Sequence, residues 1–338
     1  MSTNDVNKKQ VKAVGLLSGG LDSIVAAKVI RDMDIEVHAV YFAMPWGCCD
    51  KGKAQEAAIS LGMKFIVLQL DERYLEIVKN PKHGRGSALN PCVDCRIHMF
   101  SRAGKYMRQI GADFIFTGEV LGQRPMSQKK HSMRCIEKNA DVDGRILRPL
   151  SAQLLDPTIP EQEGLIDRNK LLSINGRSRK EQISLAKNLG LDAYNQPAGG
   201  CLLTDPNFAK RMEDTFKFGY RNFRETVALQ WGKHFRLADD IKVIIGRNED
   251  ENKALTQYAH GDDFVMELLK KDGPTLILKT KKPTEETLKL AGGLLQRFSK
   301  YKNQTDIIVE YWNKSDRNTI KNTTAYQPSE STLEKLKV

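Results

Sequence analysis

The chain has 338 residues, 40% of them hydrophobic, and is long enough for two or three domains with cores of their own. Lys and Arg number 53 against 42 Asp and Glu, a formal net charge of +11, which suits a polyanionic partner but does not require one. The sequence has no apolar signal core and no run of about 18 apolar residues, which argues against membrane-spanning and secreted classes and predicts a cytoplasmic protein.

The first 120 residues alternate short apolar runs with helical patterns. We expect strands over 11–17, 36–42, 64–70 and 113–117, and helices over 22–31, 50–61 and 92–110. Such alternation is typical of right-handed crossovers and predicts an α/β fold with a parallel sheet covered on both faces. Ligands of such sheets bind beyond the carboxyl ends of the strands.

The first strand runs into a glycine turn, Ser18-Gly19-Gly20-Leu21-Asp22-Ser23. Two glycines let the backbone turn tightly and approach a polyanion, and the N-terminus of the next helix favours negative charge. Hydroxyl groups add hydrogen-bond donors, and the carboxylate is a ligand that Mg²⁺ prefers. The segment therefore predicts a phosphate cradle, although Ser-Gly-Gly also occurs in plain turns.

In full, and placed between a strand and a helix, this motif resembles the signature of the PP-loop (N-type) ATP pyrophosphatases. It differs from a Walker loop, which has Lys before its Ser or Thr. The resemblance implies an adenine nucleotide hydrolase-like domain that uses ATP and Mg²⁺ and releases pyrophosphate and then AMP. The nucleotide-binding residues that it implies are Ser18, Gly19, Gly20, Leu21, Asp22, Ser23, Phe42, Thr117, Gly118 and Gln123.

Six cysteines in a cytoplasmic chain indicate metal or redox chemistry more than a disulfide framework. Cys92 and Cys95 open the helix expected over 92–110, and their spacing puts both thiols on one face. We expect the helix N-terminus, with Arg96 and Arg102, to lower their pKa values.

Cys201, just after Gly199 and Gly200, is the best candidate for a third member of the group. Other interpretations stay open: a redox disulfide, a structural zinc site that includes Cys135, and thiols that only fill the core. Cys48 and Cys49 are adjacent and point in different directions, so we expect packing for at least one of them.

Segments 90–95, 117–123 and 199–201 resemble tRNA thiolation enzymes of the 2-thiouridylase and 4-thiouridine synthetase groups. In cluster-dependent members, three cysteines hold a [4Fe-4S] cluster with one iron open. The resemblance implies Cys92, Cys95 and Cys201 as cluster ligands and catalytic residues, and Asp22 as a catalytic residue and Mg²⁺ ligand. Some relatives have Asp where Cys92 stands and use a persulfide relay, so Cys92 favours the cluster.

Three segments follow with weaker signals. Residues 124–148 carry seven Lys and Arg, and we expect a basic loop or hairpin beside the site, or else an ordinary solvated surface. Ser178 and Glu181 predict a capping box at the start of a helix that ends at Asn188. Further helices are expected over 208–216 and 223–231.

From residue 233 the pattern predicts an α+β module. Its Gly246-Arg247-Asn248 turn resembles the RNA-binding module of the fibronectin-binding and ribosome quality-control family, in which this turn contacts RNA. Lys and Arg exceed Asp and Glu there by only 3, so such a module would bind RNA through local patches. A dimerisation domain or a purely structural one is the alternative, and the last 20 or so residues are expected to fray.

The expected organisation is a flexible N-terminus (1–10), a PP-loop ATP-binding domain (11–155), an extension with Cys201 (156–232), an RNA-binding-like domain (233–315) and a polar tail (316–338). The resemblance implies a tRNA sulfurtransferase that adenylates a base carbonyl oxygen and inserts sulfur, with tRNA and a sulfide or persulfide carrier as partners. The alternatives are a PP-loop enzyme acting on a small metabolite and a nucleotide-dependent RNA-binding factor without sulfur chemistry. The modified nucleotide, the sulfur donor and the oligomeric state, dimer included, stay open.

Overall fold

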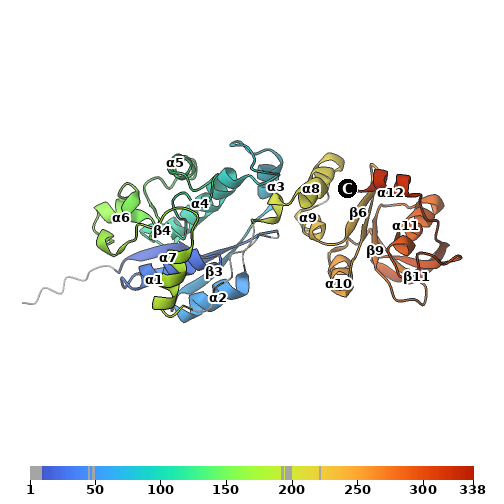
Figure 1. The fold of residues 1–338 in the computed structure, drawn as a ribbon, viewed down its shortest axis with the longest axis horizontal. Coiled ribbons are helices and arrows are strands. Elements are labelled where there is room, and N and C mark those ends of the chain that lie inside the picture. Colours follow the sequence, from blue (N-terminus) through green and yellow to red (C-terminus); the bar gives the residue numbers. More distant parts are fainter. Residues whose placement is uncertain (1–9, 45, 48–49, 192–193, 195–199, 221) are drawn as a thin grey trace, which may run out of the picture. The chain divides into compact units, whose positions relative to one another are not determined.

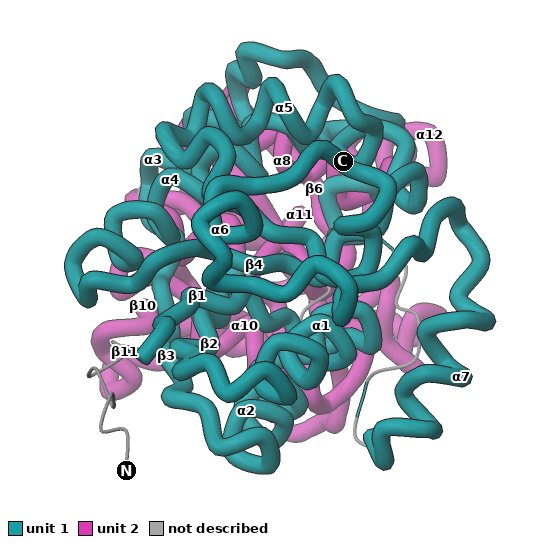
Figure 2. Tube along the Cα trace, turned by 90° about the vertical axis from the view of Figure 1, so that its left-hand side faces the viewer, with its two compact units in different colours: residues 1–204 teal, residues 205–338 magenta. Residues whose placement is uncertain are grey.

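Residues 10–338 are described by the computed structural model, apart from 45, 48–49, 192–193, 195–199 and 221. The chain divides into two compact units, residues 1–204 (unit 1) and residues 205–338 (unit 2), coloured separately in Figure 2. The division falls inside the expected 156–232 extension. Within the described residues, no helix has the length and apolar character needed to cross a membrane.

Unit 1 is built on a five-stranded sheet in the order β3-β2-β1-β4-β5, and every pair of neighbouring strands is parallel. Because the chain winds outward from β1 in both directions, a crevice opens beyond the carboxyl ends of β1 and β4. The predicted α/β class with a parallel sheet is confirmed. The strands are β1 Lys12–Leu16, β2 Glu36–Ala43, β3 Lys64–Gln69, β4 Phe114–Thr117 and β5 Ile146–Leu147.

Helices cover both faces of this sheet, with α1, α2 and α7 on one side and α4 and α5 on the other (Figure 1). Side chains of α1, α2 and α7 share one core with the strands, including Val25, Ala57 and Ala186. The α-helices of unit 1 are α1 Leu21–Arg31, α2 Lys51–Ser60, α3 Glu72–Lys79, α4 Cys92–Gln109, α5 Lys130–Asn139, α6 Ile159–Gln162 and α7 Lys180–Asn188. Short 3₁₀ turns lie at Ala152–Leu154, Arg168–Lys170 and Leu202–Thr204.

The basic segment 124–148 differs from the expected loop or hairpin. It holds helix α5, because Met133, Ile136 and Ala140 are spaced to bury one face and are at most 2% exposed. The expected capping box also fails to form. Helix α7 starts at Lys180 with Arg179 at the N-cap position, and Ser178 Oγ accepts only a 3.4 Å hydrogen bond from the Lys180 N–H.

Unit 2 holds a six-stranded antiparallel sheet in the order β11-β10-β8-β9-β7-β6. Alternate residues of β7 face two cores: Val243 and Ile245 pack with α11, whereas Ile244 packs with Leu255 of α10. The strands are β6 Lys233–Ala238, β7 Ile241–Ile245, β8 Phe264–Leu268, β9 Leu276–Lys279, β10 Ile308–Asn313 and β11 Asp316–Thr324. The helices are α8 Pro206–Phe218, α9 Phe223–Val227, α10 Glu249–Tyr258, α11 Glu285–Arg297 and α12 Glu330–Leu336, with a 3₁₀ turn at Ala228–Gln230.

The C-terminal segment is ordered, and the expectation that it frays was wrong. Strand β11 is an edge strand that pairs with β10 through its backbone, which explains why its side chains are polar and exposed. Helix α12 then buries Leu333 in the core, and the Val338 N–H donates to the His234 carbonyl at 3.0 Å.

Candidate functional site

The turn after β1 has the geometry of an anion cradle. Gly19 has a φ of +80°, and a Cβ there would lie 2.7 Å from the Asp50 carbonyl oxygen, so only glycine fits. Gly20 is the N-cap of α1 and supplies no side-chain cap for its first N–H groups. Ser23 Oγ donates to the Gly20 carbonyl at 2.8 Å and lies 3.2 Å from Ser18 Oγ. These contacts fix the turn and leave the start of α1 open to a ligand.

A pocket opens over this turn at the carboxyl ends of the strands. Of the ten nucleotide-binding residues that the resemblance implied, nine line it, and Gly19 supports it from behind. Gly118 has to be glycine here, because a Cβ would lie 2.5 Å from the Asp22 carbonyl carbon. The lining residues are Leu16, Leu17, Ser18, Gly20, Leu21, Asp22, Ser23, Val40, Tyr41, Phe42, Arg96, Met99, Thr117, Gly118, Glu119, Gln123, Arg124, Gln128 and Arg179.

Asp22 is the acidic centre of the pocket. Its Oδ2 accepts a hydrogen bond from Gln123 Nε2 at 3.2 Å and lies 3.8 Å from Arg179 Nη2. Its Oδ1 is buried and, within the described residues, has no hydrogen-bond partner. Burial raises the pKa of Asp22 above its ordinary value, against the lowering effect of Arg179 and Gln123. An unsatisfied buried carboxylate oxygen in a phosphate cradle is suited to a hard cation.

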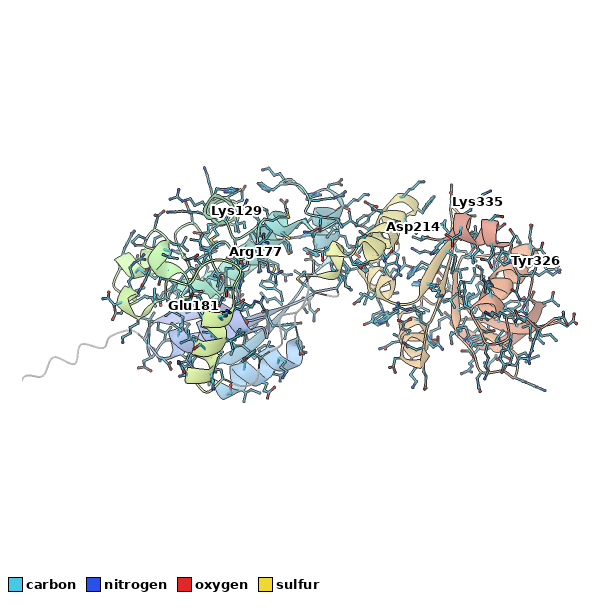
Figure 3. All side chains as sticks on the ribbon, viewed as in Figure 1. Lys129, Arg177, Glu181, Asp214, Tyr326 and Lys335 are labelled. Carbon is cyan, nitrogen blue, oxygen red and sulfur yellow. The ribbon has the colours of Figure 1, made fainter. Side chains whose placement is uncertain are left out.

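Three cationic residues line the pocket; sequence reasoning missed Arg179, placed Arg124 in a basic segment beside the site, and linked Arg96 only to the cysteines. Arg96 comes from α4, Arg124 from the loop after β4, and Arg179 from the start of α7. No motif links these distant positions, since the fold alone brings them together. Figure 3 labels Arg177 and Glu181, the near neighbours of Arg179 in the chain.

The first turn of α4 holds both Cys92 and Cys95, as expected, and each sulfur accepts a hydrogen bond. Asn90 Nδ2 donates to Cys92 Sγ and the Tyr74 hydroxyl donates to Cys95 Sγ, both at 3.2 Å. The expected fall in the Cys95 pKa was wrong: burial raises it, and the hydrogen bond from Tyr74 and the charge of Arg96 do not offset that cost.

Two backbone hydrogen bonds hold the residues that directly follow Cys201. The Leu202 N–H donates to the Trp46 carbonyl at 3.0 Å, and the Leu89 N–H donates to the Leu203 carbonyl at 3.0 Å. Burial raises the pKa of Tyr74 well above its ordinary value, and the sulfurs of Cys95, Cys201 and Cys92 raise it further. Of the three sulfurs, that of Cys95 is the one that accepts the Tyr74 hydroxyl hydrogen bond, at 3.2 Å.

This arrangement is not a closed metal site. Over the described parts of the chain, no group of three His, Cys, Asp or Glu side chains is placed to hold a metal ion. Cys48 and Cys49 lie outside the described residues. Cys135 is on α5, where its Sγ lies 3.6 Å from Asn139 Nδ2 of the same helix.

Helix α4 connects the cysteines to the nucleotide pocket. Cys95 Sγ lies 3.8 Å from Met99 Sδ one turn further on, and Met99 and Arg96 both line the pocket. The soft sulfur donors and the phosphate cradle are thus separated by one turn of helix.

The basic segment contributes little free charge beside this pocket. Arg148 is buried, with its guanidinium 3.1 Å from Glu119 Oε2 and 2.5 Å from Glu137 Oε1. Lys130 and Arg134 both pair with Asp156. Arg148 is thus part of the core, Lys130 and Arg134 form exposed surface pairs, and Arg124 alone of the seven lines the pocket.

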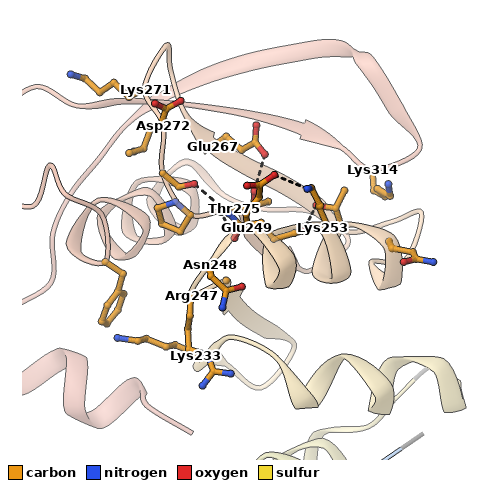
Figure 4. A pocket seen from close by; sticks show the side chains of 18 residues that line it. Lys233, Arg247, Asn248, Glu249, Lys253, Glu267, Lys271, Asp272, Thr275 and Lys314 are labelled. Atoms are coloured by element: carbon orange, nitrogen blue, oxygen red, sulfur yellow. Dashed lines mark hydrogen bonds and ion pairs between the residues drawn. The ribbon is translucent and has the colours of Figure 1, made fainter. Parts of the chain in front are cut away.

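In unit 2 the Gly246-Arg247-Asn248 turn lines a second pocket, shown in Figure 4. Asn248 caps α10 by accepting from the Glu251 N–H at 2.9 Å, and the Glu251 carboxylate accepts from the Arg247 N–H at 3.0 Å. A Cβ at Gly246 would lie 2.0 Å from Asn252 Oδ1. Other cationic side chains around the pocket are Lys233, Lys253, Lys271 and Lys314.

Family comparisons match the two parts of the chain separately. Residues 8–154 match the model of the thiamine biosynthesis protein (ThiI), and residues 232–335 match the NFACT protein RNA binding domain. The predicted family resemblance is confirmed in both parts. The PP-loop part carries the nucleotide pocket and the paired cysteines, and the NFACT part carries the Gly246-Arg247-Asn248 turn.

Curated relatives are tRNA-specific 2-thiouridylases. MnmA of Clostridioides difficile (strain 630) is 28% identical over 260 residues, covering 68% of this chain and 65% of the relative. MnmA 2 of Clostridium botulinum (strain Hall) is 24% identical over 268 residues, covering 73% of this chain and 70% of the relative. The chain thus spans about two thirds of the length of these relatives.

Two solved structures are similar at lower identity. A 4-thiouridine synthetase in complex with RNA and ATP is 21% identical, with a TM-score of 0.37, covering 60% of this chain and 50% of that one. The U34-tRNA thiolase NcsA from Methanococcus maripaludis with its [4Fe-4S] cluster is 16% identical, with a TM-score of 0.32, covering 62% of this chain and 66% of that one.

Proposed function

We propose that this protein is an ATP-dependent tRNA sulfurtransferase that activates a base carbonyl oxygen with ATP and replaces that oxygen with sulfur. The observation that carries the proposal is the position of α4. Its first turn presents Cys92 and Cys95, and its second turn lines the phosphate cradle with Arg96 and Met99. The matches to the ThiI model and to the 2-thiouridylases support the same activity.

The pocket residues would bind ATP through its phosphates. The uncapped N–H groups at the start of α1 and the hydroxyls of Ser18 and Ser23 face the polyanion, and Arg124 and Arg179 add positive charge. Asp22, with its unsatisfied Oδ1, would hold Mg²⁺, which neutralises charge on the leaving pyrophosphate. The absence of a Walker Lys fits transfer of AMP better than transfer of the γ-phosphate.

The reaction proceeds in two displacements. The base carbonyl oxygen attacks the α-phosphorus of ATP, and the bond to pyrophosphate breaks. Sulfide from a donor then adds to the activated carbon, the carbon–oxygen bond breaks, and AMP leaves with the oxygen. Adenylation is required because oxide is too poor a leaving group. In this scheme the pocket positions the α-phosphorus and stabilises the charge that develops on both leaving groups.

We also propose that Cys92, Cys95 and Cys201 hold a [4Fe-4S] cluster. The donor set fits such a group by its chemistry, since cysteine sulfurs are the ligands that iron–sulfur clusters take, and the sulfurs of Cys92 and Cys95 already accept hydrogen bonds. When bound, the cluster would supply an open iron for sulfide. Zinc binding and a persulfide relay on the same cysteines are the alternatives that the experiment below separates.

Unit 2 would bind the tRNA. The lysines around the Gly246-Arg247-Asn248 turn supply phosphate contacts, and the match to the NFACT RNA-binding domain supports this role. The cytoplasmic location and the exchange of sulfur with a carrier protein are further parts of the proposal.

The test is anaerobic incubation of the full chain with ATP, Mg²⁺, sulfide and tRNA, followed by mass spectrometry of the nucleosides. Cys92→Ser, Cys95→Ser and Cys201→Ser should each abolish the thionucleoside, and Cys135→Ser on α5 is the matched control. Iron with a brown colour supports the cluster, and zinc alone supports the structural site. In a parallel incubation with a persulfide donor in place of sulfide, a protein persulfide without iron supports the relay. ATP hydrolysis with no thionucleoside from any tRNA would contradict the proposal and favour a small-metabolite substrate.

A further inference from the structure

Two buried polar side chains next to the cysteine pair direct their donors at sulfur. Tyr74 is 1% exposed, and its ring stacks on the buried Trp46 with centroids 6.2 Å apart and planes 25° apart. This packing fixes the ring, so its hydroxyl has to find a partner in the interior. The partner is Cys95 Sγ at 3.2 Å.

Asn90 is fixed in a similar way by the backbone. It is 5% exposed, and its Oδ1 accepts a hydrogen bond from the Ala88 N–H at 3.2 Å. That bond assigns the orientation of the amide, because the backbone group can only donate. The amide nitrogen then points at Cys92 Sγ, 3.2 Å away, with Met126 Sδ further off at 3.7 Å.

An anionic or metal-bound sulfur makes better use of these two donors than a neutral thiol does. A thiol sulfur is a weak acceptor, and a buried hydroxyl or amide donor aimed at one gains little. A thiolate, or a sulfur bound to a metal, carries negative charge and accepts a charge-assisted hydrogen bond of about twice the strength. Each helix cysteine has one such donor, and neither donor belongs to the nucleotide pocket.

We propose that Tyr74 and Asn90 are positioning residues of the cysteine site, each holding one sulfur through a hydrogen bond that favours its metal-bound, anionic state and raises the reduction potential of the cluster. The inference rests on the proposed function, since it concerns the cluster assigned to Cys92, Cys95 and Cys201. Hydrogen bonds to cluster sulfurs stabilise the more negative, reduced state. The donors also orient the two thiol groups before the metal arrives.

The test is a spectroelectrochemical titration of the anaerobically reconstituted full chain, with electron paramagnetic resonance of the reduced form. Tyr74→Phe removes only the hydroxyl and should make the reduction potential more negative and change the spectrum. Asn90→Leu removes the donor without adding charge and at similar size, and it should shift the potential in the same direction. If Tyr74→Phe does not fold, the Asn90 variant alone decides the result. Tyr106→Phe is the matched control, because Tyr106 is on the same helix as the two cysteines but its hydroxyl lies 2.9 Å from His38 Nδ1 instead.

The outcomes separate this inference from the function on which it rests. A cluster whose potential is the same in the wild type and both variants overturns the positioning role and leaves the proposed function intact. A wild-type protein that takes up no iron overturns the proposed cluster, and this inference with it. A shift in Tyr106→Phe as large as in Tyr74→Phe would also overturn it, because the effect would then not depend on contact with sulfur.

Discussion

Buried carboxylates in the two units are used in opposite ways. In unit 1, Asp22 Oδ1 and Gln128 Oε1 line the pocket, are buried and, among the described residues, lack hydrogen-bond partners. In unit 2, Asp214 of α8 (labelled in Figure 3) accepts from Arg236 Nη2 and from Lys242 Nζ, both at 2.7 Å. In unit 2 the carboxylate of Asp214 has its hydrogen-bond partners within the protein, whereas in unit 1 the pocket oxygens need a bound ligand as their partner.

This difference separates groups that stabilise the fold from groups that stabilise a ligand. An unsatisfied buried oxygen costs about 1–3 kcal/mol and persists when a ligand satisfies it. Asp22 has a pKa raised by burial, so its charge is unfavourable in the folded protein. Burial opposes ionisation of Asp214 too, but the hydrogen bonds from Arg236 and Lys242 lower its pKa overall. Substitutions at the two carboxylates should therefore affect activity and stability differently.

The largest expected effect is at Asp22. Asp22→Asn should reduce Mg²⁺-dependent ATP turnover by about 10²-fold or more, because the cation loses its charged ligand. Since the folded-state pKa is raised, ionisation destabilises the fold once the pH exceeds the ordinary Asp range, so the variant should also melt at a higher temperature near pH 7. Turnover assays and calorimetry check both. Asp32→Asn, at the C-cap of the same helix and paired with Lys28, is the control and should change neither. Full activity in Asp22→Asn would contradict the account.

A smaller loss is expected at Arg179, which pairs only loosely with Asp22 and would turn to the phosphates of ATP. A hydrogen bond between charged groups contributes about 1.5–3 kcal/mol, so Arg179→Ala should weaken ATP binding by roughly 10-fold or more. Isothermal titration of ATP measures this. Arg177→Ala, two residues earlier and exposed, is the matched control. Equal affinities in the two variants would remove Arg179 from the site.

Lysines of unit 2 should contribute to RNA affinity and to its dependence on salt concentration. Lys271→Gln and Lys314→Gln, at the pocket of Figure 4, should each weaken tRNA binding a few-fold and lower the slope of log affinity against log salt by about 1. Filter binding at several salt concentrations gives the slope. Lys289→Gln on α11 is the control, because Lys289 lies outside that pocket and pairs with Glu285. Unchanged slopes would show that this pocket does not meet the RNA.

The smallest expected effect is at Lys242, which donates a hydrogen bond to Asp214 in unit 2. Burial lowers the pKa of Lys242 to about 8, below its ordinary value of 10.5. Between pH 8 and 10.5 the unfolded chain then binds more protons than the folded one at this site, so its contribution to stability rises with pH, by at most about 1.4 kcal/mol per pH unit. Urea titrations should show the unfolding free energy of the wild type rising relative to Lys242→Met across that window. A constant difference would contradict the lowered pKa.

Patterns of adjacent residues predicted more of the molecule than did residues that are far apart in the sequence. The alternation of strands and helices depends on adjacent residues and predicted the parallel sheet, and the resemblance of the glycine turn to the PP-loop signature implied nine of the pocket residues. Arg179 and Tyr74 could not be found in this way, because each reaches its site only through the packing of a distant helix. Strand β11 was missed for the opposite reason: its polar side chains face solvent, and its pairing is carried by the backbone.

The central claim is that nucleotide activation and sulfur insertion are one coupled reaction on neighbouring turns of α4. Its most direct test is to quench anaerobic reactions of the full chain with tRNA, ATP, Mg²⁺ and sulfide and to count products by mass spectrometry. The account predicts one AMP and one pyrophosphate for each thionucleoside formed. Release of ADP and orthophosphate as the main products, or thionucleoside formation without ATP cleavage, would contradict it.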